Sequence, residues 1–238
     1  MEALQSIGQF FARWLAQLET TFVEKQRYLL LVDGLKNTLI ITAGALVIGV
    51  VIGSLVAMIK YCGQDSRLLR PLCWLCSVYT TVIRGVPVVV QLLIFYFLIL
   101  KSSDGLVVGI VTFGINSGAY VAELVRSGIA AVDPGQMEAG RSLGLNYFTT
   151  MRFIVIPQAI KNILPALGNE FITLLKDTSL ITVIGGKEMT YAAKAVIAKT
   201  YQGLFPLFGI ALMYLLLVML FSKLLSVLER RLRQSDRR

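Results

Sequence analysis

The sequence contains no histidine and few cysteines, and these absences narrow the chemistry that it can carry out. Without histidine, the Ser-His and Cys-His arrangements of nucleophilic catalysis are excluded, as are most zinc sites. Three cysteines are too few for a secreted disulfide framework. Two of them, Cys73 and Cys76, lie in an apolar run, which favours helix packing over redox or metal chemistry. No enzymatic activity, metal site or cofactor is therefore expected.

The sequence is also too hydrophobic for an ordinary soluble protein. Hydrophobic residues make up 56% of it and its mean hydropathy is +0.72, which indicates an integral membrane protein. The formal charge of +9 would suggest a nucleic-acid partner in a soluble chain, but here the basic residues crowd behind the last hydrophobic segment. That position is typical of a cytoplasmic flank, so no nucleic-acid partner is expected. These residues are Lys223, Arg230, Arg231, Arg233, Arg237 and Arg238.

Five segments are long and apolar enough to cross a membrane as helices. A hydrocarbon layer of about 30 Å needs about 20 helical residues. The segments are residues 36–60, 70–100, 106–130, 157–183 and 205–228. The sequence therefore predicts an all-α, polytopic membrane protein with five transmembrane helices.

The first two crossings carry distinctive patterns. Small residues let helices approach closely, so the first crossing is expected to pack inside a bundle. Its small residues are Gly44, Ala45, Gly49, Gly53 and Ala57. In the second crossing, Pro87 removes a backbone donor and disfavours helix at Val86, which predicts a kink or break at residues 84–87. Arg84 at this break either snorkels to the interface or lines a cavity.

Residues 1–33 precede the predicted transmembrane domain, which spans residues 34–233 and is followed by a basic tail at 234–238. Within residues 4–22, apolar side chains recur on one helical stripe, which predicts an amphipathic helix lying at the membrane surface rather than a cleaved signal peptide. The stripe consists of Leu4, Ile7, Phe11, Trp14, Leu18 and Phe22.

The distribution of Lys and Arg predicts the orientation. The 60–70 linker, the 126–161 region and the tail are basic and belong in the cytoplasm. Five crossings then leave the N-terminal helix outside, together with a turn at 101–105 and a loop at 184–204. Three lysines of that loop depart from the pattern, namely Lys187, Lys194 and Lys199.

Residues 134–157 form a polar insert between two hydrophobic segments. Asp133 can cap a helix, Pro134 suits a first turn and Gly144 can end the helix, while Glu138 lies near its positive N-terminal end. The insert is therefore expected to be a folded docking element.

The fourth crossing has a polar face. Asn162, Asn169, Thr173 and Lys176 recur at helical spacing, and Glu170 lies about 20 Å beyond Pro157, near mid-membrane. An ionisable group there costs several kcal/mol unless it is paired or hydrated. Glu170 and Asp177 therefore indicate either a water-filled substrate path or internal ion pairs, for example between Glu170 and Lys176.

The third crossing adds polar residues that would line the same cavity, Asn116, Ser117 and Tyr120. Glu123 and Arg126 are three residues apart on a helix and are expected to pair with each other.

The sequence contains neither an ATP site nor an internal repeat. Residues 185–188 superficially resemble a phosphate loop, but Ile181 replaces its first glycine and Glu188 its magnesium-binding hydroxyl. Any ATP hydrolysis therefore belongs to another polypeptide. Because the chain lacks inverted halves, a dimer with a pathway between subunits is expected.

Glu138-Ala139-Gly140, followed by Gly144 and Ile156-Pro157, resembles the EAA signature of ABC importer permeases. Three further stretches, RGVPVVVQLLIFY at 84–96, NSGAYVAELVRSGI at 116–129 and LPALGNEFITLLKDTSLI at 164–181, resemble the polar amino acid permeases of these importers, the histidine, glutamine and arginine type. The resemblance covers about residues 34–233.

This resemblance implies a type I ABC importer permease fold in a bacterial inner membrane, with the N-terminus outside and the C-terminus cytoplasmic. It implies a dimer of ABC ATPase subunits, a second permease subunit, identical or homologous, and an extracytoplasmic amino-acid-binding protein as partners. The substrate would be a polar amino acid, and the lipid bilayer surrounds the protein.

The resemblance also assigns roles to residues. The coupling residues would be Pro134, Gln136, Glu138, Ala139, Gly140, Ser142, Leu143 and Gly144. Gly140 replaces the family's usual second alanine, which is expected to loosen the short helix by about 0.5–1 kcal/mol. The substrate-binding residues would be Asn116, Ser117, Tyr120, Asn169, Glu170 and Thr173, with Glu170 meeting the ammonium group.

The sequence is also compatible with two other functions. An ion-gradient-driven secondary amino acid transporter would explain the intramembrane carboxylates, and a non-transporting membrane scaffold would explain the docking insert. The ABC permease is favoured because it accounts for both features.

Overall fold

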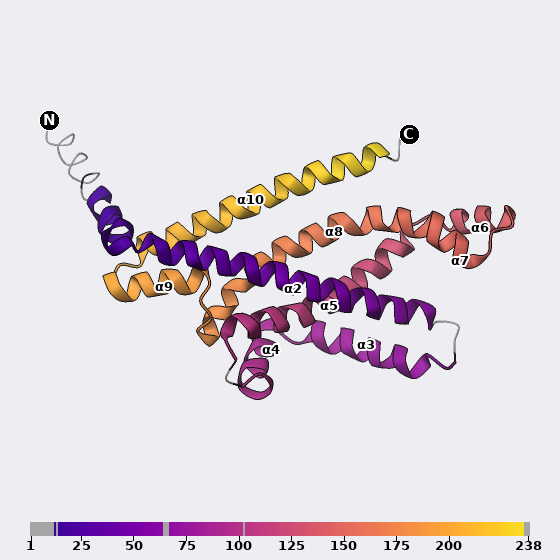
Figure 1. Cartoon of the computed structure of the whole chain (residues 1–238), viewed down its shortest axis with the longest axis horizontal. Coiled ribbons are helices and arrows are strands. Elements are labelled where there is room, and N and C mark those ends of the chain that lie inside the picture. The colour runs from indigo at the N-terminus through magenta and orange to yellow at the C-terminus, as the bar shows by residue number, and fades with distance from the viewer. Residues whose placement is uncertain (1–11, 13, 64–66, 102, 236–238) are drawn as a thin grey trace.

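The computed structural model describes residues 12, 14–63, 67–101 and 103–235, and the regular elements in these ranges are all helical. The molecule is elongated, with the N-terminal segment and α9 (Met189–Thr200) at one end and α6 (Pro134–Ser142) and α7 (Tyr147–Thr150) at the other (Figure 1). We call these the α9 end and the α6 end. The expected all-α fold is confirmed.

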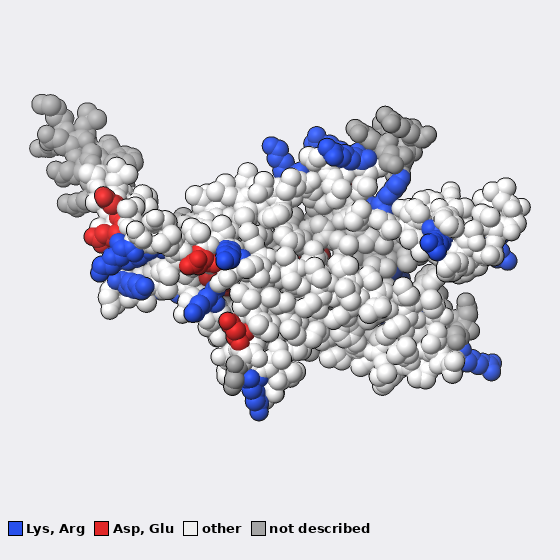
Figure 2. All heavy atoms as spheres, in the orientation of Figure 1, with Lys and Arg blue, Asp and Glu red and all other residues white. Residues whose placement is uncertain are grey.

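Three long apolar helices could cross a membrane, namely α2 (Tyr28–Cys62), α5 (Gly105–Ala130) and α10 (Leu204–Ser235). A fourth span results if α3 (Arg70–Gly85) is counted together with the apolar run at 88–99. These counts apply to the described ranges. The visible middle of the molecule presents almost no charged side chains, as a lipid-facing surface requires (Figure 2).

The predicted break in the second crossing is confirmed. Helix α3 ends at Gly85 and α4 (Val88–Ile94) begins after Pro87, with a bend of 106° between the two halves. Val86 has an extended backbone, as expected for a residue before proline. A π-helical turn, η3 (Phe95–Ile99), continues α4.

Helices α2 and α5 pack against each other along much of their length. A Cβ atom on Gly49 of α2 would lie 2.8 Å from Oγ of Ser117 on α5, closer than real side chains approach. On Gly53 it would lie 2.6 Å from Cβ of Val121. The small residues of the first crossing therefore place two backbones in close contact, as the sequence predicts.

The fourth crossing begins with a π-helical turn, η4 (Met151–Val155), continues as α8 (Ile156–Asp177) and ends in a 3-10 turn, η5 (Thr178–Ile184). Helix α8 contacts α5, α2 and α10. Its polar face keeps it below the apolar content that marks the other spans among the described residues. The total of five crossings therefore stays a prediction.

The segment at 184–204, expected as a loop between two crossings, contains a helix, α9. Glu188 is fully buried and caps α9, since its carboxylate accepts hydrogen bonds from the amides of Thr190 at 2.7 Å and Tyr191 at 2.8 Å. The hydroxyl of Tyr214 on α10 donates to the same carboxylate at 3.1 Å. The main chain of Glu188 also packs so closely against Gly34 of α2 that a Cβ atom on Gly34 would lie 3.0 Å from its carbonyl. Glu188 thus joins three helices.

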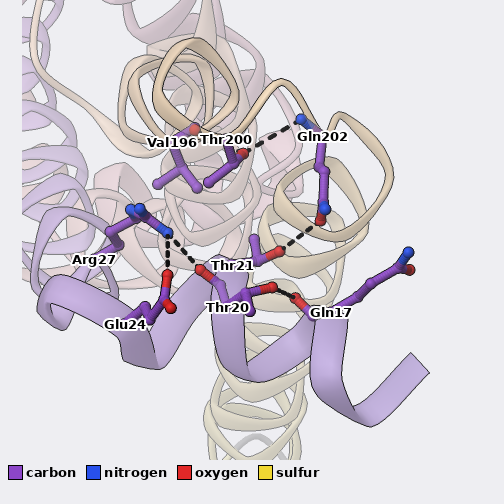
Figure 3. A network of polar contacts seen from close by, with 8 residues as sticks. All are labelled: Gln17, Thr20, Thr21, Glu24, Arg27, Val196, Thr200 and Gln202. Atoms are coloured by element: carbon purple, nitrogen blue, oxygen red, sulfur yellow. Dashed lines mark hydrogen bonds and ion pairs between the residues drawn. The ribbon is translucent and has the colours of Figure 1, made fainter. Parts of the chain in front are cut away.

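The N-terminal segment folds back onto the α9 end through η1 (Glu19–Val23) and η2 (Glu24–Gln26). Figure 3 shows Thr21 donating to Gln202 in the turn between α9 and α10, at 3.0 Å. The ring of Trp14 meets Phe205 edge-on with ring centroids 5.2 Å apart. Of the predicted apolar stripe, Leu4, Ile7 and Phe11 lie outside the described residues.

Candidate functional site

A cavity of about 390 Å³ opens where the break between α3 and α4 faces α5 and α8. Its walls carry two carboxylates, one guanidinium, one amide and two hydroxyls, together with the backbone of the break. The lining residues are Arg84, Gly85, Val86, Pro87, Val88, Asn116, Tyr120, Glu170, Thr173, Leu174 and Asp177. A small zwitterion would find partners for both of its charges here.

Hydrogen bonds from Gln91 of α4 stabilise the break, and the side chain of Gln91 is only 4% exposed. Its amide nitrogen donates to the carbonyls of Ile83 at 2.7 Å and Val86 at 2.8 Å, which lie at the end of α3. Its amide oxygen accepts a bond from Asn116 at 3.2 Å. Gln91 therefore satisfies backbone groups that the break leaves without helical partners, and it also orients a cavity side chain.

Glu170 lies opposite the break on α8. The hydroxyl of Ser117 donates to its carboxylate at 2.7 Å. Ser117 is fully buried against Gly49 and so fixes one oxygen of the carboxylate from behind. The alternative ion pair between Glu170 and Lys176 is not formed between these two described residues, whereas Arg126 pairs with Glu123. The latter pair is the one predicted within the third crossing.

Arg84 lines the cavity, as one of its two expected placements required. Its guanidinium lies over the ring of Tyr120, 5.2 Å from the centroid, and both residues line the cavity. This cation–π contact orients the side chain, and it uses the face of the guanidinium rather than the N–H donors at its edge.

The structure sorts the six predicted substrate residues into three groups. Asn116, Tyr120, Glu170 and Thr173 line the cavity, and Ser117 lies behind it. Asn169 does not line the cavity but is exposed, and its amide bonds back to the carbonyl of Pro165 on its own helix.

Three residues at or beside the cavity are not among the predicted substrate residues. Arg84 and Asp177 are charged residues within predicted crossings, and this is a signal that the sequence itself carries. Gln91 stands out as the only polar side chain between Pro87 and Tyr96, four residues after the break, but its partners are set by tertiary contacts.

The insert at the α6 end has the predicted local structure. The carboxylate of Asp133 caps α6 through the amide of Gly135 at 2.8 Å, with Pro134 in the first turn. Gly144 has a φ of +78°, and its amide bonds to the carbonyl of Arg141 while that of Leu145 bonds to Gly140. This pair of bonds is a Schellman motif, in which glycine supplies the left-handed residue.

Gly140 has a packing role that its helix propensity does not reveal. It is buried in the insert, and a Cβ atom there would lie 2.5 Å from Cγ2 and 2.7 Å from Oγ1 of Thr150 on α7. The expectation that glycine merely loosens α6 is therefore incomplete, because it also lets α7 pack directly against the helix.

Two of the remaining insert residues form side-chain hydrogen bonds, and several are exposed. Gln136 accepts a bond from Gln158 at 3.2 Å, and the hydroxyl of Ser142 bonds to the carbonyl of Glu138 at 2.9 Å. Ala139 is exposed, and Leu143 is 79% exposed at the tip. Phe148, 71% exposed, follows on α7. A rigid element with apolar side chains at its tip is suited to insertion into a partner's groove.

Comparison with known proteins identifies the family. The model of the binding-protein-dependent transport system inner membrane component matches residues 49–234. The chain belongs to this family. The arginine transport system permease protein of Bacillus subtilis is 38% identical over 210 residues, covering 87% of this chain and 94% of that protein. The glutamine transport system permease protein of Escherichia coli K12 is 36% identical over 213 residues, covering 86% and 93%.

Solved structures agree with this assignment. An amino acid ABC transporter crystallised with histidines is 44% identical, with a TM-score of 0.82, covering 88% of this chain and 98% of that one. An inward-facing methionine ABC transporter has a TM-score of 0.73 over 86% of this chain and 97% of its own, and at 21% identity it supports the fold. This permease therefore has the type I ABC importer fold.

The family assignment defines the function of the permease. It is a membrane-embedded subunit of an ABC importer that forms the path for solute, and a separate ATPase hydrolyses ATP. An ATPase and a binding protein are therefore partners of this permease.

Proposed function

We propose that this permease takes up a polar amino acid through the cavity between the break and α8. The observation that carries the proposal is the presence of Glu170, Asp177 and Arg84 in one cavity of amino-acid size. An amino acid in water carries an ammonium and a carboxylate at its α carbon. The two carboxylates would hold the ammonium group and Arg84 the carboxylate, while Asn116, Tyr120 and Thr173 would add neutral hydrogen bonds.

The relatives support this substrate class. Their names assign them glutamine and arginine, and the similar solved structure is an amino acid transporter. Ser117 would position Glu170 rather than touch the substrate. Asn169 would contribute from the exposed side of α8, facing the path between two permease subunits.

ATP binding would act on the cavity through the α6 end. We propose that α6 docks on an ATPase subunit through the exposed Leu143, with Glu138 and Ala139 beside it and Pro134, Gln136, Gly140, Ser142 and Gly144 shaping the element. A second permease, identical or homologous, would present the same element to a second ATPase subunit. Closure of the ATPase pair would then move the two inserts together and switch access to the cavity.

The placement in the membrane follows from this docking. The insert and the basic tail at 234–238 would lie in the cytoplasm, and residues 1–33 would lie outside at the membrane surface, beside the binding protein. The permease domain would span residues 34–233 with five crossings, although α2 already begins at Tyr28.

Reconstitution of the permease with its ATPase in proteoliposomes tests the proposal. ATP-dependent uptake of a labelled polar amino acid is expected, stimulated by the binding protein. Glu170→Gln should reduce uptake at least tenfold while the complex with the ATPase still co-purifies, and Glu229→Gln, the same change on α10, should have no effect. Uptake driven by an ion gradient without the ATPase would instead establish a secondary transporter, and unchanged uptake by Glu170→Gln would remove this residue from the site.

A further inference from the structure

A second cavity, of about 470 Å³, lies at the α9 end, where the N-terminal segment meets α2 and α9. Three of its six lining residues are basic, and two of the others are leucines. The residues are Lys25, Gln26, Arg27, Leu29, Leu30 and Lys199. The transport cycle proposed above makes no use of this cavity, which we call the basic pocket.

Arg27 is the buried basic residue of the basic pocket. Its side chain is 9% exposed, and one guanidinium nitrogen donates to the carbonyl of Thr20 and lies 3.9 Å from the carboxylate of Glu24, as Figure 3 shows. Its Nε has no hydrogen-bond partner. A buried guanidinium with one distant carboxylate and an unmatched donor is costly, and a nearby anion would offset that cost.

The start of α2 adds a second attraction for an anion. This helix is 35 residues long and begins directly after Arg27, and no side chain caps its first turn. The amide of Leu30 already bonds to the carbonyl of Arg27 at 3.1 Å, and the dipole of the long helix still favours a negative group at this end.

The surrounding charge is also positive. Lys25 and Lys199 are exposed, and neither takes part in an ion pair among the described residues. A neighbouring cavity adds Lys36 and Lys187, together with the carboxylates of Asp33 and the fully buried Glu188. In Figure 2 the basic side chains at this end stand out beside a few acidic ones. These lysines include two of the three that depart from the expected orientation pattern.

The apolar surroundings indicate what kind of molecule carries the anion. Tyr28, Leu29 and Val32, along the first turns of α2, are 45%, 45% and 53% exposed. Trp14 and Tyr201 are 43% and 93% exposed at the same end, and such aromatic side chains gather at the level of lipid headgroups. A phosphate in the basic pocket would therefore have an apolar surface beside it, on which acyl chains can lie.

We propose that the basic pocket binds the phosphate of an anionic phospholipid. The phosphate would lie between Lys25, Lys199 and the start of α2, with Arg27 beneath it, and the acyl chains would run down the exposed face of α2. Because the N-terminal segment and α9 supply opposite walls, a bound lipid would hold the two segments together.

Thermal unfolding of the full-length permease in a neutral detergent tests this site. Short-chain phosphatidylglycerol is expected to raise Tm in a saturable way, whereas phosphatidylcholine of the same chain length is not. Changing Lys25→Gln and Lys199→Gln together should weaken the phosphatidylglycerol effect roughly tenfold or more, since each basic residue near an anionic headgroup contributes to binding. Both side chains are exposed, so the double variant is expected to fold.

Lys194→Gln is the matched control, because Lys194 is an exposed lysine of α9 that does not line the basic pocket. It should leave the phosphatidylglycerol titration unchanged. Wild-type binding by the double variant, or an equal loss in Lys194→Gln, would overturn the site. Inorganic phosphate should protect far less than phosphatidylglycerol at equal concentration, and equal protection would overturn the assignment to a lipid in favour of a free phosphate.

Discussion

Gly140 of α6 and Thr150 of α7 pack so closely that no side chain fits between them, because a Cβ atom on Gly140 would lie 2.5 Å from Cγ2 of Thr150. Thr150 is itself fully buried, and its hydroxyl bonds to the carbonyl of Asn146 at 3.1 Å. The shape of the docking element therefore depends on a contact between two turns of the chain, as well as on the helix propensity of either turn.

Gly140→Ala should destabilise the docking element even though alanine favours helices. Overpacking of a tight contact typically costs about 1–3 kcal/mol, which exceeds the gain of about 0.5–1 kcal/mol from replacing a helical glycine. We expect reduced ATPase stimulation in the reconstituted complex. Adding Thr150→Ala removes both atoms nearest to the new Cβ and should restore much of the activity. A Gly140→Ala variant with wild-type coupling would show that the contact relaxes freely.

Gln91→Leu should disturb the cavity without removing any residue that lines it. The change leaves the carbonyls of Ile83 and Val86 without their donor, and Asn116 loses its acceptor. Each carbonyl that stays buried without a partner should lower the free energy of unfolding by about 1–3 kcal/mol. A lower Tm together with a higher KM for uptake is expected. Gln17→Leu, on an exposed part of the N-terminal segment, should change neither. A lower Tm with unchanged KM would limit Gln91 to a structural role.

Ser117→Ala should weaken substrate binding by about tenfold, because a hydrogen bond to a carboxylate contributes about 1.5–3 kcal/mol. The small side chain still fits against Gly49, so folding should be preserved. Ser117→Thr is an informative contrast, since it keeps the hydroxyl but adds a methyl group where space is already lacking. It should lower Tm, whereas Ser117→Ala should alter uptake at nearly constant Tm. Equal uptake by wild type and Ser117→Ala would argue against a positioning role.

Glu188→Gln should destabilise the α9 end. Both carboxylate oxygens accept from main-chain amides, so one of them would be replaced by an NH2 group that faces a donor. We expect a loss of about 1–3 kcal/mol, measured as a fall in Tm or in the denaturant midpoint. Glu19→Gln, an exposed glutamate in the N-terminal segment, is the control and should leave Tm unchanged.

Features fixed by neighbours in the chain could be predicted from the sequence. Pro87 broke the second crossing, Asp133 capped α6 and Gly144 ended it, since each of these effects operates within a few residues. The ion pair between Glu123 and Arg126 is local in the same way. Helix spacing also brought four of the six expected substrate residues to one cavity.

Features that depend on contacts between distant segments could not be predicted. Helix α9 is short and carries two lysines, and the burial of its capping residue Glu188 follows from contacts with Tyr214 on α10 and Gly34 on α2. The side of α8 on which Asn169 emerges depends on how that helix is rotated against α5. Residue types can show that polar groups lie within a membrane, but the partners of those groups are decided by tertiary packing.

The close approach of α2 and α5 has a mechanical consequence. Ser117 and Val121 project toward positions where α2 has only glycine, so sliding one helix along the other would drive these side chains into bulkier neighbours. The two helices should therefore keep fixed positions relative to each other during alternating access, while the elements around them rearrange. Spin labels on their lipid-facing sides would then report one constant separation throughout the ATP cycle.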